Sequence, residues 1–165
     1  FRVLIHIFNN IVAHAIEPPD ERRTKAKPER ARIECHVEMR NGKLVIEIAD
    51  DGRGIDPERI REEMRLRTGL TVAEASRVPD QDLMQRVFEP GYSSTLMADT
   101  LSGRGIGLFA VAHATRQLGG TVRVTSRVGA FTRFSFLLPV RQPLNADNPI
   151  PLVERPLSAT ERRHA

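Results

Sequence analysis

The segment IEIADDGRGI ends an alternating apolar stretch with Asp50 and places Gly52 and Gly54 directly after it. A carboxylate fixed at the end of a strand can accept a hydrogen bond from the exocyclic amine of adenine, and glycines let a flat base approach the backbone closely. The same letters would also suit an ordinary Asp-Asp-Gly turn. A calcium loop does not fit, because the sixth and twelfth positions from Asp50 are Ile55 and Arg61, where such a loop needs Gly and Glu. Asp50 is therefore a candidate residue for recognising a purine base.

A second glycine-rich segment, SGRGIGL at residues 102–108, leads directly into a stretch with an apolar helical face. Free backbone amides and the positive end of the helix dipole would then point at one spot, which suits a phosphate. A flexible glycine hinge is the other interpretation, because a glycine loop alone is a weak signal. A Rossmann site fits badly, since the third glycine comes one place early and no strand directly precedes the loop. The lysine of a Walker loop is also missing.

Three polar residues, His6, Asn10 and His14, recur every four positions near the start of the chain. On a helix this spacing places them on one stripe, which could hold a metal ion. The His and Glu pattern of a zinc-protease helix is missing, whereas the carbonyl oxygen of Asn10 is the kind of ligand that Mg²⁺ prefers. Polar residues satisfied within the protein, with no metal, remain the alternative. Taken together, the three segments supply each part that a site for ATP requires.

The elements that must position these residues begin with a helix predicted over Phe1–Ala15. Because no capping residue precedes this helix, we expect that upstream sequence has been removed. Pro18-Pro19 ends the helix, and the charged stretch through Arg30 is predicted to be an exposed loop. The apolar face of the helix is predicted to comprise Leu4, Ile5, Phe8, Ile11, Val12 and Ala15.

Alternating patterns predict the strands. Ala31–Met39 is expected to be a half-buried strand, and Asn41-Gly42 a hairpin turn that brings Lys43–Ala49 back antiparallel to it. Thr121–Ser126 and Phe131–Leu138 form a last predicted pair, with Gly129 in the turn.

Helical patterns alternate with these strands. They are predicted over Pro57–Arg67, over Asp80–Val87 with Asp80 as its cap, and over Gly105–Leu118 with Gly119-Gly120 as its stop, whereas Phe88–Arg104 is expected to be a mobile loop. The expected fold is an α+β two-layer sandwich, in which a mixed, mostly antiparallel sheet packs against helices. Residues 1–140 are expected to form one domain and residues 141–165 a linker or disordered tail.

Composition limits the class of protein. The net charge is +4 and the pI about 10.0, but arginines are scattered among acidic residues and aromatic residues make up only 5% of the chain, so no nucleic-acid partner is expected. Cys35 is the single cysteine, so no intrachain disulfide can form and a cytoplasmic location is expected. No apolar run reaches the ~18 residues that span a bilayer. No direct membrane segment is expected, although the parent protein could be tethered to a membrane.

The motifs in this order resemble the GHKL ATPase superfamily, and within it the catalytic domain of histidine kinases. The segment HIFNNIVAHAIE from His6 is similar to the N box, and residues 50–55 are similar to the first glycine box. Phe88–Ser94 is similar to the F box, and Ser102–Leu108 to the second glycine box. The segments HAIEPPDERR, FEPGYSS and SGRGIG are most similar to the chemotaxis-type histidine kinases.

The resemblance implies roles for single residues. Asn10 would hold Mg²⁺, His14 and Arg104 would lie near the phosphates, Asp50 would bind adenine with Thr132 beneath the base, and His6 would lie near the attacked phosphate. The boxes would also supply cofactor-binding positions at Gly52, Gly54, Ile55, Phe88, Ser102, Gly103, Gly105, Ile106, Gly107 and Leu108. The implied fold is the Bergerat fold of histidine-kinase ATPases.

The implied function is that of a two-component signalling histidine kinase, which transfers the γ-phosphoryl group of Mg-ATP to a histidine. The acceptor is expected on a histidine phosphotransfer or dimerisation domain outside this chain, with a response regulator downstream. Asn9, Ala13 and Phe109 depart from the pattern of chemotaxis-type kinases. The departures at Asn9 and Ala13 support an alternative, a degenerate nucleotide-sensing or docking module without kinase activity. A topoisomerase or mismatch-repair type ATPase is a third interpretation, but it would need a second domain for which 165 residues leave no room.

Overall fold

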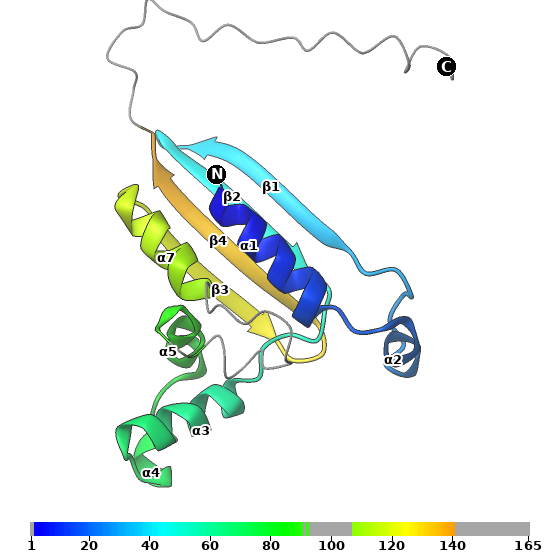
Figure 1. The fold of residues 1–165 in the computed structure, drawn as a ribbon, viewed down its shortest axis with the longest axis vertical. Helices are drawn as coiled ribbons and strands as arrows, with labels where there is room; N and C mark the ends of the chain where they lie inside the picture. Colours follow the sequence, from blue (N-terminus) through cyan, green and yellow to red (C-terminus); the bar gives the residue numbers. More distant parts are fainter. Residues whose placement is uncertain (1, 91, 93–106, 141–165) are drawn as a thin grey trace, which may run out of the picture.

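A computed structural model describes residues 2–90, 92 and 107–140 of the chain. One antiparallel sheet forms the first layer of this part, in the strand order β1-β2-β4-β3 (Figure 1). The strands are β1 (Ile33–Arg40), β2 (Lys43–Asp50), β3 (Thr121–Arg127) and β4 (Phe131–Pro139). The predicted two-layer α+β fold is confirmed, and in the described residues every pairing is antiparallel, where a mixed sheet was expected.

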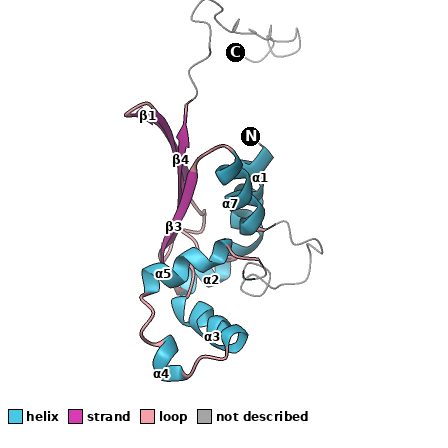
Figure 2. Ribbon diagram, turned by 90° about the vertical axis from the view of Figure 1, so that its left-hand side faces the viewer, coloured by secondary structure: helices cyan, strands magenta, loops and turns pink. Residues whose placement is uncertain are grey.

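Helices form the second layer. Figure 2 shows α1 and α7 lying on one face of the sheet, with the helices α3, α4 and α5 gathered beyond one end of the strands. The helical elements are α1 (Arg2–Asn10), the π-helical turn η1 (Ile11–Ala15), α2 (Pro19–Thr24), α3 (Pro57–Thr68), α4 (Val72–Ala75), α5 (Asp80–Gln85), the 3-10 turn η2 (Arg86–Phe88) and α7 (Leu108–Gln117). None of them is long and apolar enough to cross a bilayer in the part of the chain that the structure describes.

The core lies between the two layers. Inward residues of β2, β3 and β4 pack against α1 and α7, as the alternating pattern of these strands predicts. The buried residues at this contact include Ile7, Ile11, Ile46, Ile48, Leu108, Val111, Val124, Phe134, Phe136 and Leu138.

The first helix differs from its predicted form in its last turn. Ile16 N–H donates to the carbonyl of Ile11 at 3.1 Å, a bond across five residues that widens the helix into the π turn η1. The buried stripe follows Ile7 and Ile11, whereas Ile5 and Val12, which were predicted on the apolar face, are exposed. That part of the prediction was wrong because the apolar residues outnumber the positions that the sheet can cover.

The segment predicted as an exposed loop through Arg30 contains a helix, α2, with Pro19 at its first position. Arg22 on this helix is fully buried. Most of the segment is exposed, as predicted, but the helix and the burial of Arg22 were not predicted. Arg22 is buried because it pairs with Glu17 and with Asp51, directly after β2.

The hairpin at Asn41-Gly42 is confirmed, since both residues have positive φ angles of 51° and 69°. The half-burial predicted for the first strand is wrong: Cys35, Val37 and Met39 are exposed although they share a face with buried residues of β2. In Figure 1 the helix layer lies over β2 and β4 and leaves the edge strand β1 beyond it.

The helix α4 was not predicted, and the other predicted helices agree with the structure except at two ends. Asp80 does not cap α5, because its side chain accepts a hydrogen bond from Arg61 at 2.6 Å and Pro79 occupies the capping position. Helix α7 begins at Leu108 and not at Gly105, because Gly107 still has an extended backbone. Its predicted stop is confirmed, with Gly119 at φ 73°. The predicted mobile loop, apart from residues 88–90 and 92, and the predicted tail at 141–165 lie outside the described residues.

Candidate functional site

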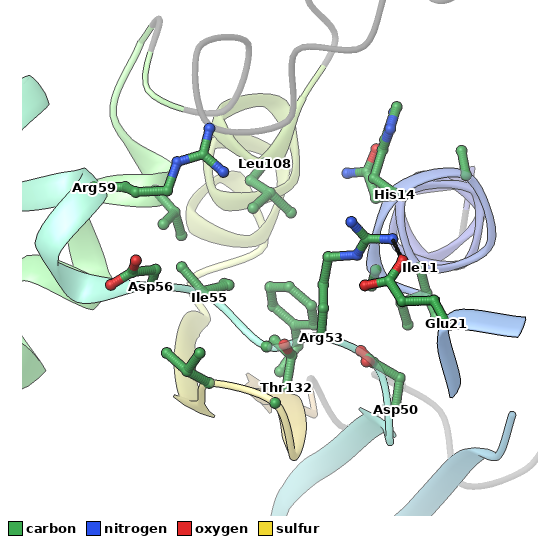
Figure 3. A pocket seen from close by; sticks show the side chains of 18 of the residues that line it. Ile11, His14, Glu21, Asp50, Arg53, Ile55, Asp56, Arg59, Leu108 and Thr132 are labelled. Carbon is green, nitrogen blue, oxygen red and sulfur yellow. Dashed lines mark hydrogen bonds and ion pairs between the residues drawn. The ribbon is translucent and has the colours of Figure 1, made fainter. Parts of the chain in front are cut away.

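A cavity of about 520 Å³ opens where the ends of β2 and β4 meet α1, α3 and α7 (Figure 3). It brings together residues that the sequence places far apart, among them Asn10, Asp50 and Leu108. The complete lining is Asn10, Ile11, Ala13, His14, Ala15, Glu21, Lys25, Asp50, Arg53, Gly54, Ile55, Asp56, Arg59, Val87, Leu108, Val128, Gly129, Thr132 and Phe134. The predicted purine-reading corner and the predicted metal helix therefore face the same space.

Asp50 is the last residue of β2 and is almost completely buried. Its Oδ1 accepts a hydrogen bond from the N–H of Gly52 at 2.9 Å, whereas Oδ2 has no hydrogen-bond partner in the described part of the protein. A buried carboxylate oxygen without a donor is costly, by about 1 to 3 kcal/mol. The exocyclic amine of adenine is a donor that would satisfy it.

Burial raises the pKa of the Asp50 carboxyl from 3.8 to about 6. The amide of Gly52 opposes this rise, the carboxylate of Asp51 adds to it, and the ammonium group of Lys27 again opposes it. Asp50 is therefore mainly a carboxylate at neutral pH, and a ligand that donates to Oδ2 would stabilise the charged form.

The two glycines after Asp50 are required by close backbone contacts. A Cβ atom on Gly52 would lie 2.3 Å from the carbonyl oxygen of Ala15, and one on Gly54, whose φ is 71°, would lie 2.4 Å from that of Arg127. Between them, the N–H of Arg53 donates to the same carbonyl of Ala15 at 2.8 Å. The corner is thus fixed between η1 and the turn that joins β3 to β4.

Thr132 lies directly opposite Asp50 on β4 and is buried. The single proton of the Ser126 hydroxyl goes to the carbonyl of Phe131 at 2.7 Å, so in the 3.2 Å contact between Ser126 Oγ and Thr132 Oγ1 the threonine must donate. Both lone pairs of Thr132 Oγ1 therefore remain available to a ligand in the cavity.

Asn10 lies on the other side of the cavity, at the junction of α1 and η1. Its buried Nδ2 has no hydrogen-bond partner among the described residues. Mg²⁺ usually keeps several waters and binds through one or two protein oxygens together with substrate phosphates. A single Asn oxygen fits that mode. The described residues contain no cluster of three or more His, Cys, Asp or Glu side chains that could hold a metal alone.

The N-terminus of α7 faces the same cavity through Leu108, and no side chain of the described residues caps it. Uncapped amides at a helix N-terminus, together with the helix dipole, favour an anion. Figure 3 shows His14 and Arg59 on opposite sides of this helix end, both reaching toward the open space. This end of the cavity therefore suits phosphates, while the Asp50 end suits a base.

A family model described as "Histidine kinase-, DNA gyrase B-, and HSP90-like ATPase" matches residues 2–142. The chain belongs to this family. The prediction of a GHKL-type ATPase domain is thereby confirmed.

Three curated relatives narrow the comparison. A gliding motility regulatory protein of Myxococcus xanthus is 37% identical over 82% of this chain and 18% of its own length. The sensor histidine kinase CheAY of Helicobacter pylori is 32% identical over 83% of this chain and 17% of its own length. The chemotaxis protein CheA of Bacillus subtilis is 34% identical over 83% of this chain and 20% of its own length. The predicted similarity to chemotaxis-type kinases is confirmed. The chain spans about a fifth of the length of these relatives.

Within this ATPase domain, the predicted site residues fall into three groups. Those that line the cavity are Asn10, His14, Asp50, Gly54, Ile55, Leu108 and Thr132. Those that are described but do not line it are His6, one turn before Asn10 on α1; Gly52, behind the corner; Phe88, which packs edge-to-face on Phe134 in the core; and Gly107, which caps α7. Those outside the described residues are Ser102, Gly103, Arg104, Gly105 and Ile106.

The charged rim of the cavity was not predicted from the sequence. Arg53 pairs with Glu21 of α2 at 3.5 Å, and Glu21 also receives a 2.7 Å bond from Lys25, so α2 borders the base end of the cavity. Arg59 projects from the first turn of α3 toward the phosphate end. The dense charge of the segment PPDERRTKAK was the available signal, but it was interpreted as a solvated loop.

Proposed function

We propose that this chain is the ATP-binding catalytic domain of a two-component signalling histidine kinase, which transfers the γ-phosphoryl group of Mg-ATP to a histidine on another domain. The observation that carries the proposal is the buried, unpartnered Oδ2 of Asp50 at the base end of the cavity. The similarity to a sensor histidine kinase and to a chemotaxis protein supports the signalling role.

In this proposal each side of the cavity binds one part of Mg-ATP. Asp50 accepts the exocyclic amine, Thr132 lies under the base, and the end of α7 with His14 and Arg59 faces the phosphates. Asn10 would hold Mg²⁺, which supplies neutralisation of the charge on the phosphates when it is bound. Arg104 would add a further positive charge. The role of His6 near the attacked phosphate stays a prediction, because it does not line the cavity.

The chemical step is a displacement at phosphorus. The bond between the γ-phosphorus and the oxygen that bridges it to the β-phosphate breaks, a bond to an imidazole nitrogen of the acceptor forms, and ADP leaves. The domain contributes mainly by holding the nucleotide in position and by balancing charge, because phosphoryl transfer needs little covalent help from the protein.

The acceptor histidine is proposed to lie on a phosphotransfer or dimerisation domain of the same parent protein or of a partner chain, and a response regulator would take the phosphoryl group next. Neither described histidine outside the site suits that role. His36 is exposed beside Glu38 on β1, and His113 stacks on Phe109 along α7. The proposed location is the cytoplasm, where ATP is available.

The test is phosphoryl transfer from γ-labelled ATP to the histidine phosphotransfer domain of the parent protein, added as a separate polypeptide. Label on that domain, and its absence when Asp50→Asn replaces the wild-type chain, is the expected result. ATP binding without any transfer would instead assign the chain to the second class, a nucleotide-sensing or docking module. Failure to bind ATP at all would refute both.

A further inference from the structure

A network of charged groups lies directly behind the Asp50 corner and outside the cavity. Arg22, which is fully buried, donates to Glu17 at 3.2 Å and to the carboxylate of Asp51 at 2.8 Å. Its Nε also donates to the carbonyl of Pro28 at 2.6 Å. Glu17 and Asp51 balance the charges of Arg22 and Lys27, and the partly exposed Lys25 also lies 3.6 Å from Glu17.

Lys27 joins the network from the end of the same segment. Its ammonium group donates to Glu17 at 2.8 Å and to two backbone carbonyls, that of Asp51 at 2.9 Å and that of Gly52 at 2.7 Å. Burial acts to raise the pKa of Glu17, but the hydrogen bond and charge of Lys27, together with a backbone hydrogen bond and the charge of Lys25, outweigh it and leave that pKa below its ordinary value. Glu17 is therefore a carboxylate that balances the charge of Lys27, while the two backbone carbonyls hold the ammonium group in place.

One planar group connects this network to the site. The carbonyl of Asp51 and the N–H of Gly52 belong to the same peptide bond, whose atoms lie in one plane. Lys27 and Arg22 hold the carbonyl end, at 2.9 Å and 3.3 Å, while the N–H end donates to Asp50 Oδ1 at 2.9 Å. Fixing the carbonyl thus fixes the direction of the N–H, which in turn decides where the second oxygen of Asp50 points.

Stability alone is a weak explanation for this arrangement. Buried ion pairs are often no better than apolar residues of the same volume, because removing two charges from water costs about as much as their attraction returns. Orientation of a specific peptide group, by contrast, needs strong donors at defined positions, and two cations supply them.

We propose that Arg22 and Lys27 are positioning residues for base recognition: by holding the carbonyl of the Asp51–Gly52 peptide, they turn Oδ2 of Asp50 toward the exocyclic amine of the base. The proposal rests on the proposed function, since it assumes that the cavity binds a purine nucleotide. It also concerns nucleotide specificity, because the network sets the preference for an amine over a carbonyl group at the position of the base that Asp50 faces.

The experiment compares the affinities of the 165-residue chain for ADP and for inosine diphosphate, which carries a carbonyl oxygen where adenine carries the amine. In the wild type, ADP is expected to bind about tenfold more tightly, which is the usual worth of a hydrogen bond to a charged group. Lys27→Met is expected to reduce this ratio at least threefold, whereas Lys43→Met, the same change on the exposed start of β2, leaves it unchanged.

Three further variants separate positioning from folding. Glu17→Gln removes the buried negative charge but leaves Lys27 on the peptide carbonyls, so it should keep the wild-type ratio. Glu17→Gln combined with Lys27→Met leaves no unbalanced buried charge and should show the reduced ratio in a folded protein. In an Asp50→Asn background, Lys27→Met should no longer change the ratio, because the two residues act through one contact.

A folded Lys27→Met or double variant that keeps the wild-type ratio would overturn the positioning role. A double variant that does not fold would overturn it as well, because Lys27 would then serve stability. Neither result bears on the proposed function, which fails if the wild-type chain binds no adenine nucleotide or transfers no phosphoryl group.

Discussion

At the scale of single residues, the site depends on one carboxylate that the protein leaves half satisfied. Asp50 receives one backbone hydrogen bond on Oδ1 and none on Oδ2 in the described structure, and burial raises its pKa to about 6. Without a ligand, this unsatisfied oxygen destabilises the folded protein, and a ligand that donates to Oδ2 removes the destabilisation. Two predictions follow from the titration of this group.

The first prediction concerns the free energy of unfolding of the protein without ligand. The pKa of Asp50 is 3.8 in its ordinary state and about 6 in the fold, so the unfolded chain loses this proton first and the folded state is penalised as the pH rises from about 4 through 6. Asp50→Asn should therefore raise the free energy of unfolding at pH 7.5 by roughly 2 kcal/mol, and by much less near pH 4. Urea unfolding at both pH values measures this. Asp82→Asn, an exposed acid on α5, is the control, and a destabilised Asp50→Asn at pH 7.5 would contradict the account.

The second prediction concerns the affinity for ADP as a function of pH. Because the carboxylate form of Asp50 accepts the amine, affinity for ADP should rise about tenfold between pH 5 and pH 7, as a group with a pKa of about 6 loses its proton. Calorimetric titration at several pH values measures this rise. Asp50→Asn, titrated alongside, should retain only the part that comes from the phosphates of the nucleotide. An identical pH profile for the two proteins would exclude Asp50 from the base contact.

At the scale of elements, the corner after β2 must touch η1. The missing Cβ of Gly52 would lie 2.3 Å from the carbonyl of Ala15, whereas that of Gly69, at the end of α3, meets nothing within 4 Å. Gly52→Ala should lower the free energy of unfolding by about 3 kcal/mol through this clash. Gly69→Ala, whose φ of 71° is strained for alanine, should cost about 1 kcal/mol. Thermal unfolding compares them, and equal losses would mean that the corner can move away from η1.

The junction of α1 and η1 carries the proposed metal ligand, Asn10, opposite the uncapped end of α7. Removal of Mg²⁺ with a chelator should weaken ATP binding to the wild-type chain. In Asn10→Ala the same treatment should change the affinity at least threefold less, if one of the contacts to the ion is lost. Fluorescent-nucleotide displacement with and without chelator measures both. An equal response in the two proteins would place the ion elsewhere.

The elements that sequence predicted well are those whose signals are local. Alternation in Lys43–Ala49, the Asn41-Gly42 turn and the stop at Gly119 each depend on a few neighbouring residues, and the structure confirms them. The widening of the first helix at Ile11–Ala15 was not predictable in this way, because it follows from a bond that crosses five residues next to the glycine corner.

At the scale of the whole molecule, the convergence of Asn10, Asp50 and Leu108 on one cavity was predictable from the order of the motifs. The burial of Arg22 was not, because its partner Asp51 lies 29 positions away and a charged segment normally faces water. The exposure of β1 was also missed. An alternating strand predicts which face is apolar, but only the extent of the helix layer decides whether that face is covered.

The most direct test of the account is a crystal structure of the chain with bound ADP. The account predicts that the exocyclic nitrogen of adenine lies within about 3.2 Å of Asp50 Oδ2 and that the phosphates lie at the N-terminal end of α7. A base bound outside the cavity, or one whose amine points away from Asp50, would contradict it.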